Sequence, residues 1–126
     1  MFKLIIFLLF PVIMNGQTFK SSATAHIIES YEIEFMKRTI EINDYEIIII
    51  SQGKEYKDIQ TLNVVEIEEK KFGNFGVCFW YYCNTKNISG SEKLIIVPKQ
   101  ENPKQLSIFE PSKDGASTKE FKIMLE

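Results

Sequence analysis

The sequence has little of several residue types on which common protein classes depend. Its 126 residues include two cysteines, one histidine, four prolines and six glycines, and the formal net charge is −2. Two cysteines are too few for a disulfide-rich scaffold, and the scarcity of glycine and proline excludes collagen-like and low-complexity chains. The nearly balanced charge gives no electrostatic basis for binding nucleic acid. We therefore expect an ordinary folded domain that has no nucleic-acid partner.

One long apolar run is present, and it lies at the N-terminus. Lys3 precedes an almost unbroken apolar stretch over residues 4–13, and the chain becomes polar around Gly16. A basic start, an apolar segment of about 7–15 residues and a small residue at the cut are typical of a secretory signal peptide. The run is shorter than the roughly 20 residues that a membrane-spanning helix needs. It predicts a cleaved signal peptide at residues 1–16.

Residues 17–126 form the expected mature chain, which is long enough for one domain with its own core. They contain no further apolar run that could cross a membrane. We expect this single domain to be exported, either secreted or periplasmic. The junction Asn15-Gly16-Gln17, together with a composition rich in isoleucine and lysine, resembles the leaders of exported Bacteroidota proteins.

Apolar and polar residues alternate with a period of two through most of the mature chain, and this pattern is typical of half-buried strands. The expected strands are 26–35, 38–42, 45–50, 59–71, 77–83, 93–97, 106–109 and 117–126. No helical pattern of 10 or more residues interrupts them, which excludes parallel βαβ units. The sequence predicts an all-β fold, a single antiparallel meander of about eight strands that forms a small barrel or a two-layer sandwich.

Three details of this prediction concern local geometry. The strand at 26–35 has an apolar face that carries Ile27, Tyr31, Ile33 and Phe35. Asn43-Asp44 favours a two-residue type I′ turn that pairs Ile42 with Tyr45 and Ile40 with Ile47. A change of the apolar face within 59–71 indicates a β-bulge near 63–65.

The last segment, 117–126, has two interpretations. Its alternating apolar residues predict a strand. Its Ser117-Thr118-Lys119-Glu120 start is also typical of a helix capping box. The strand is favoured because strand and turn patterns fill the preceding chain.

The segment 77–83 is unusually aromatic, and both of its faces are apolar or amphipathic. One interpretation is a central strand buried on both sides. The other is an aromatic wall that lines a ligand cavity, because pockets are commonly lined by aromatic side chains. The candidate ligand-lining aromatic residues are Phe72, Phe75, Trp80 and Tyr82.

The two cysteines, Cys78 and Cys83, lie within this aromatic segment. Export favours a disulfide between them. A regular strand would separate their Cα atoms by roughly 16 Å and point the side chains to opposite faces, whereas a disulfide needs Cα atoms within about 7 Å. A bond therefore requires that the segment is not a regular strand. Otherwise the two residues are small buried apolar side chains or one of them forms an intermolecular bond.

No motif for catalysis, metal binding or cofactor binding is recognisable. His26 is the only histidine, and we expect it to be an exposed strand residue. The glycines form no phosphate-binding loop. We therefore expect a non-enzymatic binding or structural module without a cofactor, and a small apolar ligand near the aromatic strand. The alternative is an interaction protein, at the cell surface or in the periplasm, that pairs through a strand edge. A hydrolase-like enzyme is the third and least favoured interpretation.

Overall fold

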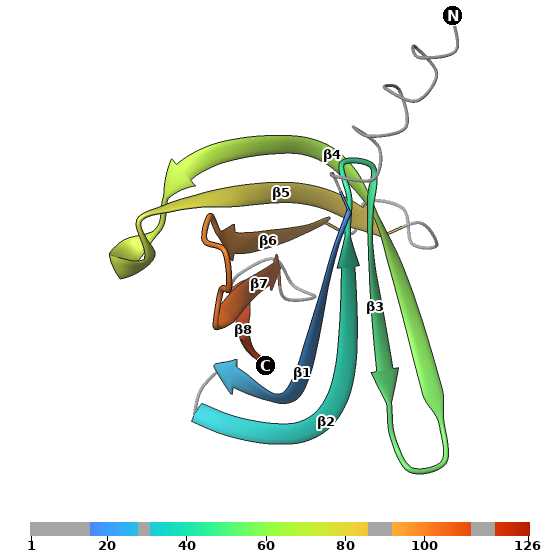
Figure 1. Ribbon diagram of the computed structural model, residues 1–126. Helices are drawn as coiled ribbons and strands as arrows, with labels where there is room; N and C mark the ends of the chain where they lie inside the picture. Colours follow the sequence, from blue (N-terminus) through green and yellow to red (C-terminus); the bar gives the residue numbers. More distant parts are fainter. Residues whose placement is uncertain (1–15, 28–30, 86–91, 112–117) are drawn as a thin grey trace, which may run out of the picture.

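The computed structural model describes residues 16–27, 31–85, 92–111 and 118–126, so the predicted signal peptide at 1–16 falls almost entirely outside the described residues. Eight strands and one short 3₁₀ helix account for the fold (Figure 1). In chain order they are β1 (Gln17–Ile27), β2 (Tyr31–Ile42), β3 (Glu46–Gln52), β4 (Lys57–Lys71), η1 (Gly73–Phe75), β5 (Val77–Thr85), β6 (Glu92–Pro98), β7 (Gln105–Pro111) and β8 (Thr118–Leu125).

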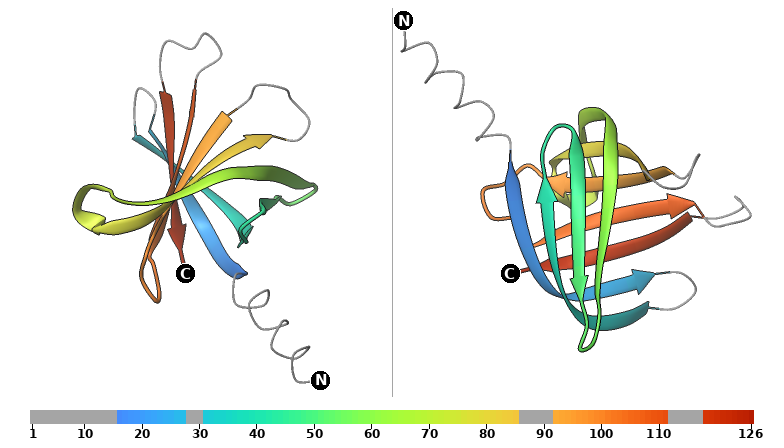
Figure 2. Two further views of the ribbon diagram at one scale, coloured as in Figure 1. Left: turned by 90° about the horizontal axis from the view of Figure 1, so that it is seen from above. Right: turned by 90° about the vertical axis from the view of Figure 1, so that its right-hand side faces the viewer.

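The strands form one closed antiparallel barrel in sequence order, in which β8 returns to pair with β1 (Figure 2). This confirms the all-β meander and decides between the two predicted architectures in favour of the barrel. The segment that could have been a strand or a helix is the strand β8, whose Ile123 pairs with Leu106 of β7. The strands β1, β3, β5 and β7 all end at the same end of the barrel, and we call this end the mouth.

Branched and aliphatic side chains fill the barrel interior. An eight-stranded barrel has an interior just wide enough for side chains to fill, and strands with a period of two supply every second residue to it. The buried cluster consists of Ile40, Ile42, Ile47, Ile49, Leu62, Tyr81, Cys83, Ile95, Val97, Leu106, Ile108, Ile123 and Leu125. Full burial of an aliphatic side chain stabilises a fold by roughly 1.5–3 kcal/mol, so the isoleucine-rich strands supply much of the driving force.

The structure corrects the prediction for the first strands. His26 and Ile27 belong to the end of β1, and they pair with Glu32 and Tyr31 of β2. The break predicted between the segments 26–35 and 38–42 is therefore absent, because β2 continues from Tyr31 to Ile42. The stretch 17–25 was not predicted as a strand, since short polar residues dominate it. Its small side chains are nevertheless buried, including Ser21, Thr24 and Ala25.

The predicted register of the β2–β3 hairpin is also wrong. Ile42 pairs with Ile47 rather than with Tyr45. Asn43 accounts for the longer connection, since its side-chain oxygen accepts hydrogen bonds of 2.8 Å from the backbone N–H groups of both Tyr45 and Glu46. A type I′ turn would need positive φ angles, and no described residue other than glycine has one. An asparagine side-chain turn therefore replaces the predicted type I′ turn.

The hairpin of β4 and β5 extends past the other strands and curves strongly (Figures 1 and 2). The β4–β5 register shifts between Val64 and Glu66, which confirms the predicted bulge. A bulge increases local twist and bends the strand, which suits this curvature. At the tip, Gly73 and Gly76 have φ angles of +54° and +73°, and these angles favour glycine because it lacks a Cβ atom.

Candidate ligand-binding site

An aromatic cluster covers part of the outer surface of the barrel. Trp80 alternates along β5 with the core residues Phe79 and Tyr81, so it faces outward. The ring of Phe72 meets Trp80 at 5.8 Å and Phe109 of β7 at 5.9 Å, both edge to face, and stacks on Phe75 at 6.1 Å. We call Phe72, Phe75, Trp80 and Phe109 the outer aromatic cluster. It brings together three of the four aromatic residues singled out from the sequence.

The outer aromatic cluster holds the tip of the β4–β5 hairpin against the barrel. Trp80 donates from its indole N–H to the carbonyl of Lys70 at 3.3 Å, and the Lys70 ammonium lies 4.6 Å from the Trp80 ring centroid. Aromatic and cation–π contacts of this kind add to the burial of apolar area. Beneath them, Ile96 and Ser107 are buried although they alternate with core residues of their strands. The strands β5 to β7 therefore pack on both faces.

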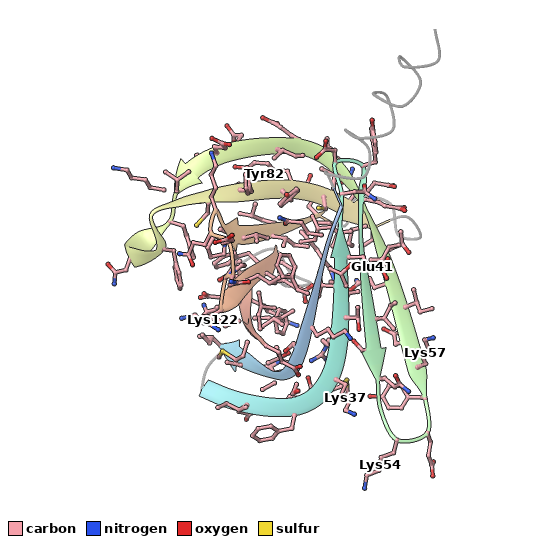
Figure 3. All side chains as sticks on the ribbon, viewed as in Figure 1. Lys37, Glu41, Lys54, Lys57, Tyr82 and Lys122 are labelled. Carbon is pink, nitrogen blue, oxygen red and sulfur yellow. The ribbon has the colours of Figure 1, made fainter. Side chains whose placement is uncertain are left out.

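Next to this cluster lies a hollow on the mouth side, with a volume of about 450 Å3. We call it the outer groove. Its lining residues are Val65, Glu66, Tyr82, Cys83, Asn84, Glu92, Lys93, Leu94, Phe109, Glu110 and Thr118. Tyr82, the fourth aromatic residue predicted from the sequence, lies on β5 (Figure 3) and lines the groove, whereas Phe72, Phe75 and Trp80 do not. The volume falls in the range of about 300–1,000 Å3 that is usual for small-molecule sites.

The register explains how the groove obtains an apolar floor. Tyr82 pairs with Leu94, and Leu94 pairs with Phe109, so the three side chains form one row across β5, β6 and β7. Side chains directly opposite each other on a sheet are about 5 Å apart and make a continuous surface. Hydrogen bonding by the Tyr82 hydroxyl lowers the pKa of the Glu68 carboxyl. The floor is therefore apolar, while the tyrosine oxygen is directed toward polar neighbours.

Charged residues surround this floor. Lys93 Nζ lies 3.0 Å from Glu110 Oε2, and both side chains are largely buried. Glu66 and Glu92 are exposed at the rim and form no ion pair with another described residue. The Lys93–Glu110 pair is neutral as a unit, so among the described lining residues Glu66 and Glu92 are the carboxylates without an ion-pair partner.

A second polar site lies inside the barrel near the mouth. Arg38 donates to Glu34 at 2.9 Å, to Thr24 at 2.7 Å and to Ser51 at 3.0 Å, and His26 Nε2 lies 3.0 Å from the same Glu34 oxygen. We call these five residues the mouth cluster. It borders a hollow of about 210 Å3, which is smaller than the outer groove. Every charged group in the cluster has a partner within it, so its contacts are internally satisfied.

Sequence reasoning did not identify the mouth cluster. The pattern at 26–35 predicts that the apolar face is buried, but Ile33 is 49% exposed and Phe35 is 83% exposed, while Glu34 points into the barrel. His26 is half-buried rather than exposed. The available signal was the even spacing of Glu34 and Arg38, which places both on one face of a strand. Leu94 and Phe109 of the outer groove were also missed because only the register brings them beside Tyr82.

Both cysteines are free thiols and lie on opposite faces of β5. Cys83 belongs to the barrel core, and burial raises its pKa to about 12. Cys78 pairs with Lys70 and Pro98 outside the core, and burial also raises the pKa of its thiol. A raised pKa keeps a thiol neutral and unreactive.

Within the described ranges, no group of three or more histidine, cysteine, aspartate or glutamate residues is arranged to hold a metal ion. The described part of the chain also contains no helix that is long and apolar enough to cross a membrane. Comparison of the sequence with protein-family models gave no match, and comparison with curated protein sequences gave none either.

Proposed function

We propose that this protein is a non-enzymatic binding barrel that holds a small, largely apolar ligand in the outer groove. The observation that carries the proposal is the row of Tyr82, Leu94 and Phe109 beneath a hollow of about 450 Å3. Small-molecule sites typically combine an apolar lining with a few polar groups that orient the ligand. The core of the barrel is filled by side chains, so the groove offers more room than the hollow at the mouth cluster.

A blocking substitution tests this proposal. Leu94→Trp would fill the floor of the groove, whereas Ile59→Trp introduces the same side chain at an exposed position on β4 that does not line it. Binding of a neutral apolar dye, N-phenylnaphthylamine, is measured by its fluorescence. We expect saturable binding to the wild type and to Ile59→Trp, and binding at least about tenfold weaker to Leu94→Trp. Unsaturable binding to the wild type, or equal binding by the two variants, would overturn the proposal.

We also propose that the domain is exported after removal of residues 1–16. The strand β1 begins at Gln17, the residue predicted to follow the cut, which supports this boundary. Expression of the full chain in a bacterium, followed by mass measurement of the extracytoplasmic protein, tests it. The expected mass is that of a chain beginning at or within two residues of Gln17. A protein that keeps residues 1–16 would contradict the proposal.

A specific observation favours a second candidate function, self-association through a strand edge. In the described part of the chain, residues 65–71 of β4 pair only with β5, because the β3 pairing ends at Asn63. Unpaired strand edges can accept another strand. This edge begins with Glu66 and Glu68 and ends with Lys70 and Lys71. Antiparallel pairing of two copies would therefore place acidic residues beside basic ones.

Charge reversal tests this second candidate. Lys70→Glu/Lys71→Glu makes the edge fully acidic, and Glu66→Lys/Glu68→Lys makes it more basic. We expect a wild-type dimer at high concentration in sedimentation experiments, no dimer for either variant alone, and a heterodimer when the two are mixed. A monomeric wild type at millimolar concentration, or dimers that persist in each variant alone, would exclude edge pairing.

A further inference from the structure

The charges around the outer groove carry information about the ligand. Three carboxylates line it, those of Glu66, Glu92 and Glu110, together with one ammonium group, that of Lys93. The Lys93 charge is already matched by Glu110 at 3.0 Å. The two remaining carboxylates are at the rim, where they attract a cation and repel an anion.

The floor of the groove also favours a positively charged ligand. Tyr82 and Phe109 present aromatic rings there, and the face of an aromatic ring attracts a cation. The protein already shows such contacts on this surface. The Lys70 ammonium lies 4.6 Å from the Trp80 ring centroid and 5.9 Å from that of Tyr82. Rings of this surface therefore accept an ammonium group at close range.

An internal ion pair keeps Lys70 from cancelling the charge of the rim. Lys70 Nζ lies 3.3 Å from Glu68 Oε1, so this lysine and glutamate are neutral as a unit. With the Lys93–Glu110 pair also neutral, Glu66 and Glu92 are the unmatched charges among the described residues that line the groove. Glu66 lies opposite Tyr82 in the register, and Glu92 lies two residues before Leu94 on β6.

We propose that the ligands of the outer groove are organic cations, each with an ammonium group attached to an alkyl or aromatic body. This proposal rests on the proposed binding function of the groove. The body lies on Tyr82, Leu94 and Phe109, and the ammonium group lies between the carboxylates of Glu66 and Glu92. The hollow of about 450 Å3 has room for such a molecule. An anionic ligand with the same body is disfavoured by both carboxylates.

Three probes with the same decyl chain test the sign of the preferred charge: decyltrimethylammonium, decyl maltoside and decyl sulfate, each below its micelle concentration. Binding to the full mature domain is measured by isothermal titration calorimetry. We expect the ammonium probe to bind about tenfold more tightly than the neutral probe, and the sulfate to bind most weakly. The preference should decrease as salt is added.

Two double variants with the same change in net charge locate the effect. Glu66→Gln/Glu92→Gln removes the rim charges, and Glu41→Gln/Glu55→Gln removes two exposed charges outside the groove lining. Glu41 lies on β2, away from Tyr82 on β5 (Figure 3). We expect the rim variant to bind the ammonium and neutral probes within about twofold of each other, and the control variant to keep the full preference.

The outcomes separate the two proposals. If no probe binds, both the groove function and the cation preference are wrong. If the neutral or sulfate probe binds as tightly as the ammonium probe, the groove binds ligands but the cation preference is wrong. If both double variants lose the preference equally, it arises from net charge rather than from Glu66 and Glu92, and the inference is overturned.

Discussion

Arg38 donates from Nη2 to Oε1 of Glu34 across 2.9 Å, inside the barrel near its mouth. Arg38 is the only arginine in the chain, and its side chain is 15% exposed. Its other contacts reach Thr24 on β1 and Ser51 on β3, so one guanidinium group connects three adjacent strands. Such planar groups with several donors hold multiple acceptors in fixed directions. The pair is therefore expected to support the barrel structure at the mouth.

Removing this guanidinium group should destabilise the fold. Arg38→Met leaves the Glu34 carboxylate without its arginine partner and removes a hydrogen bond from each of two buried hydroxyls, those of Thr24 and Ser51. We expect the free energy of unfolding in urea to fall by about 1–3 kcal/mol. As a control, Lys99→Met breaks an exposed pair with Glu69 and should cost less than about 1 kcal/mol. Equal effects of the two substitutions would show that the mouth cluster does not contribute in this way.

The same carboxylate makes stability depend on pH in the acid range. Burial raises the pKa of Glu34, but hydrogen bonds from His26 and Arg38 and the positive charge of Arg38 outweigh it and bring the pKa below its ordinary value of 4.5. A lowered folded-state pKa contributes stability that is present above 4.5 and is lost as the pH falls through the folded-state value.

Urea midpoints of the wild type and Glu34→Gln, measured from pH 7 to pH 3, check this dependence. We expect the wild type to be the more stable at pH 7 and the difference to narrow below pH 4.5. A difference that stays constant down to pH 3 would show that Glu34 is not stabilised in its charged form.

The outer aromatic cluster should hold the hairpin tip. Phe72→Ala removes the ring that contacts both Trp80 and Phe109, so we expect a lower stability and a red shift of Trp80 fluorescence as its indole becomes more exposed. The coupling energy with Trp80→Phe in a double-mutant cycle should be about 1 kcal/mol. Phe35→Ala is the control, because the Phe35 side chain is 83% exposed. Fluorescence that is unchanged in Phe72→Ala would contradict the observed packing.

The sequence was sufficient to predict the isoleucine-rich strands because their residues alternate clearly, whereas most of β1 was missed. Ile47 and Ile49 are two residues apart, and both are buried in the barrel, as the alternating pattern of the sequence predicts. The register is less predictable. The side chain of Asn43 accepts hydrogen bonds from the backbone of Tyr45 and Glu46, and this contact produces a longer turn than the predicted two-residue turn. A shift of register changes every cross-strand neighbour, and it is the register that places Leu94 between Tyr82 and Phe109.

The mouth cluster could not be predicted for a different reason. Near an open barrel end, polar side chains can face inward because they satisfy one another, so Glu34 is inside and the apolar Phe35 is outside. The rule that the apolar face is buried fails where a polar network replaces the core. Its partners come from β1, β2 and β3, and only the folded barrel brings Thr24 and Ser51 to Arg38.

The two thiols provide a test of how β5 is packed. Burial raises the pKa of Cys83 to about 12, so at pH 8 only about one thiol in ten thousand is ionised, and the thiolate is the reactive form. Cys83 lies in the core, whereas Cys78 lies outside it and next to the hairpin tip, with its Sγ 3.6 Å from the carbonyl oxygen of Gly76. We expect iodoacetamide to label neither residue rapidly in the native domain, and Cys83 to react more slowly than Cys78, because it needs opening of the barrel rather than of the tip alone.

In denaturant without any reducing agent, both cysteines should be labelled fully, and mass spectrometry of the peptides gives the two rates separately. Phe72→Ala should speed the labelling of Cys78 while leaving that of Cys83 less affected, because it loosens the tip that covers only the outer face. An unlabelled pair in denaturant would mean that Cys78 and Cys83 are bonded and that β5 is not the regular strand seen here.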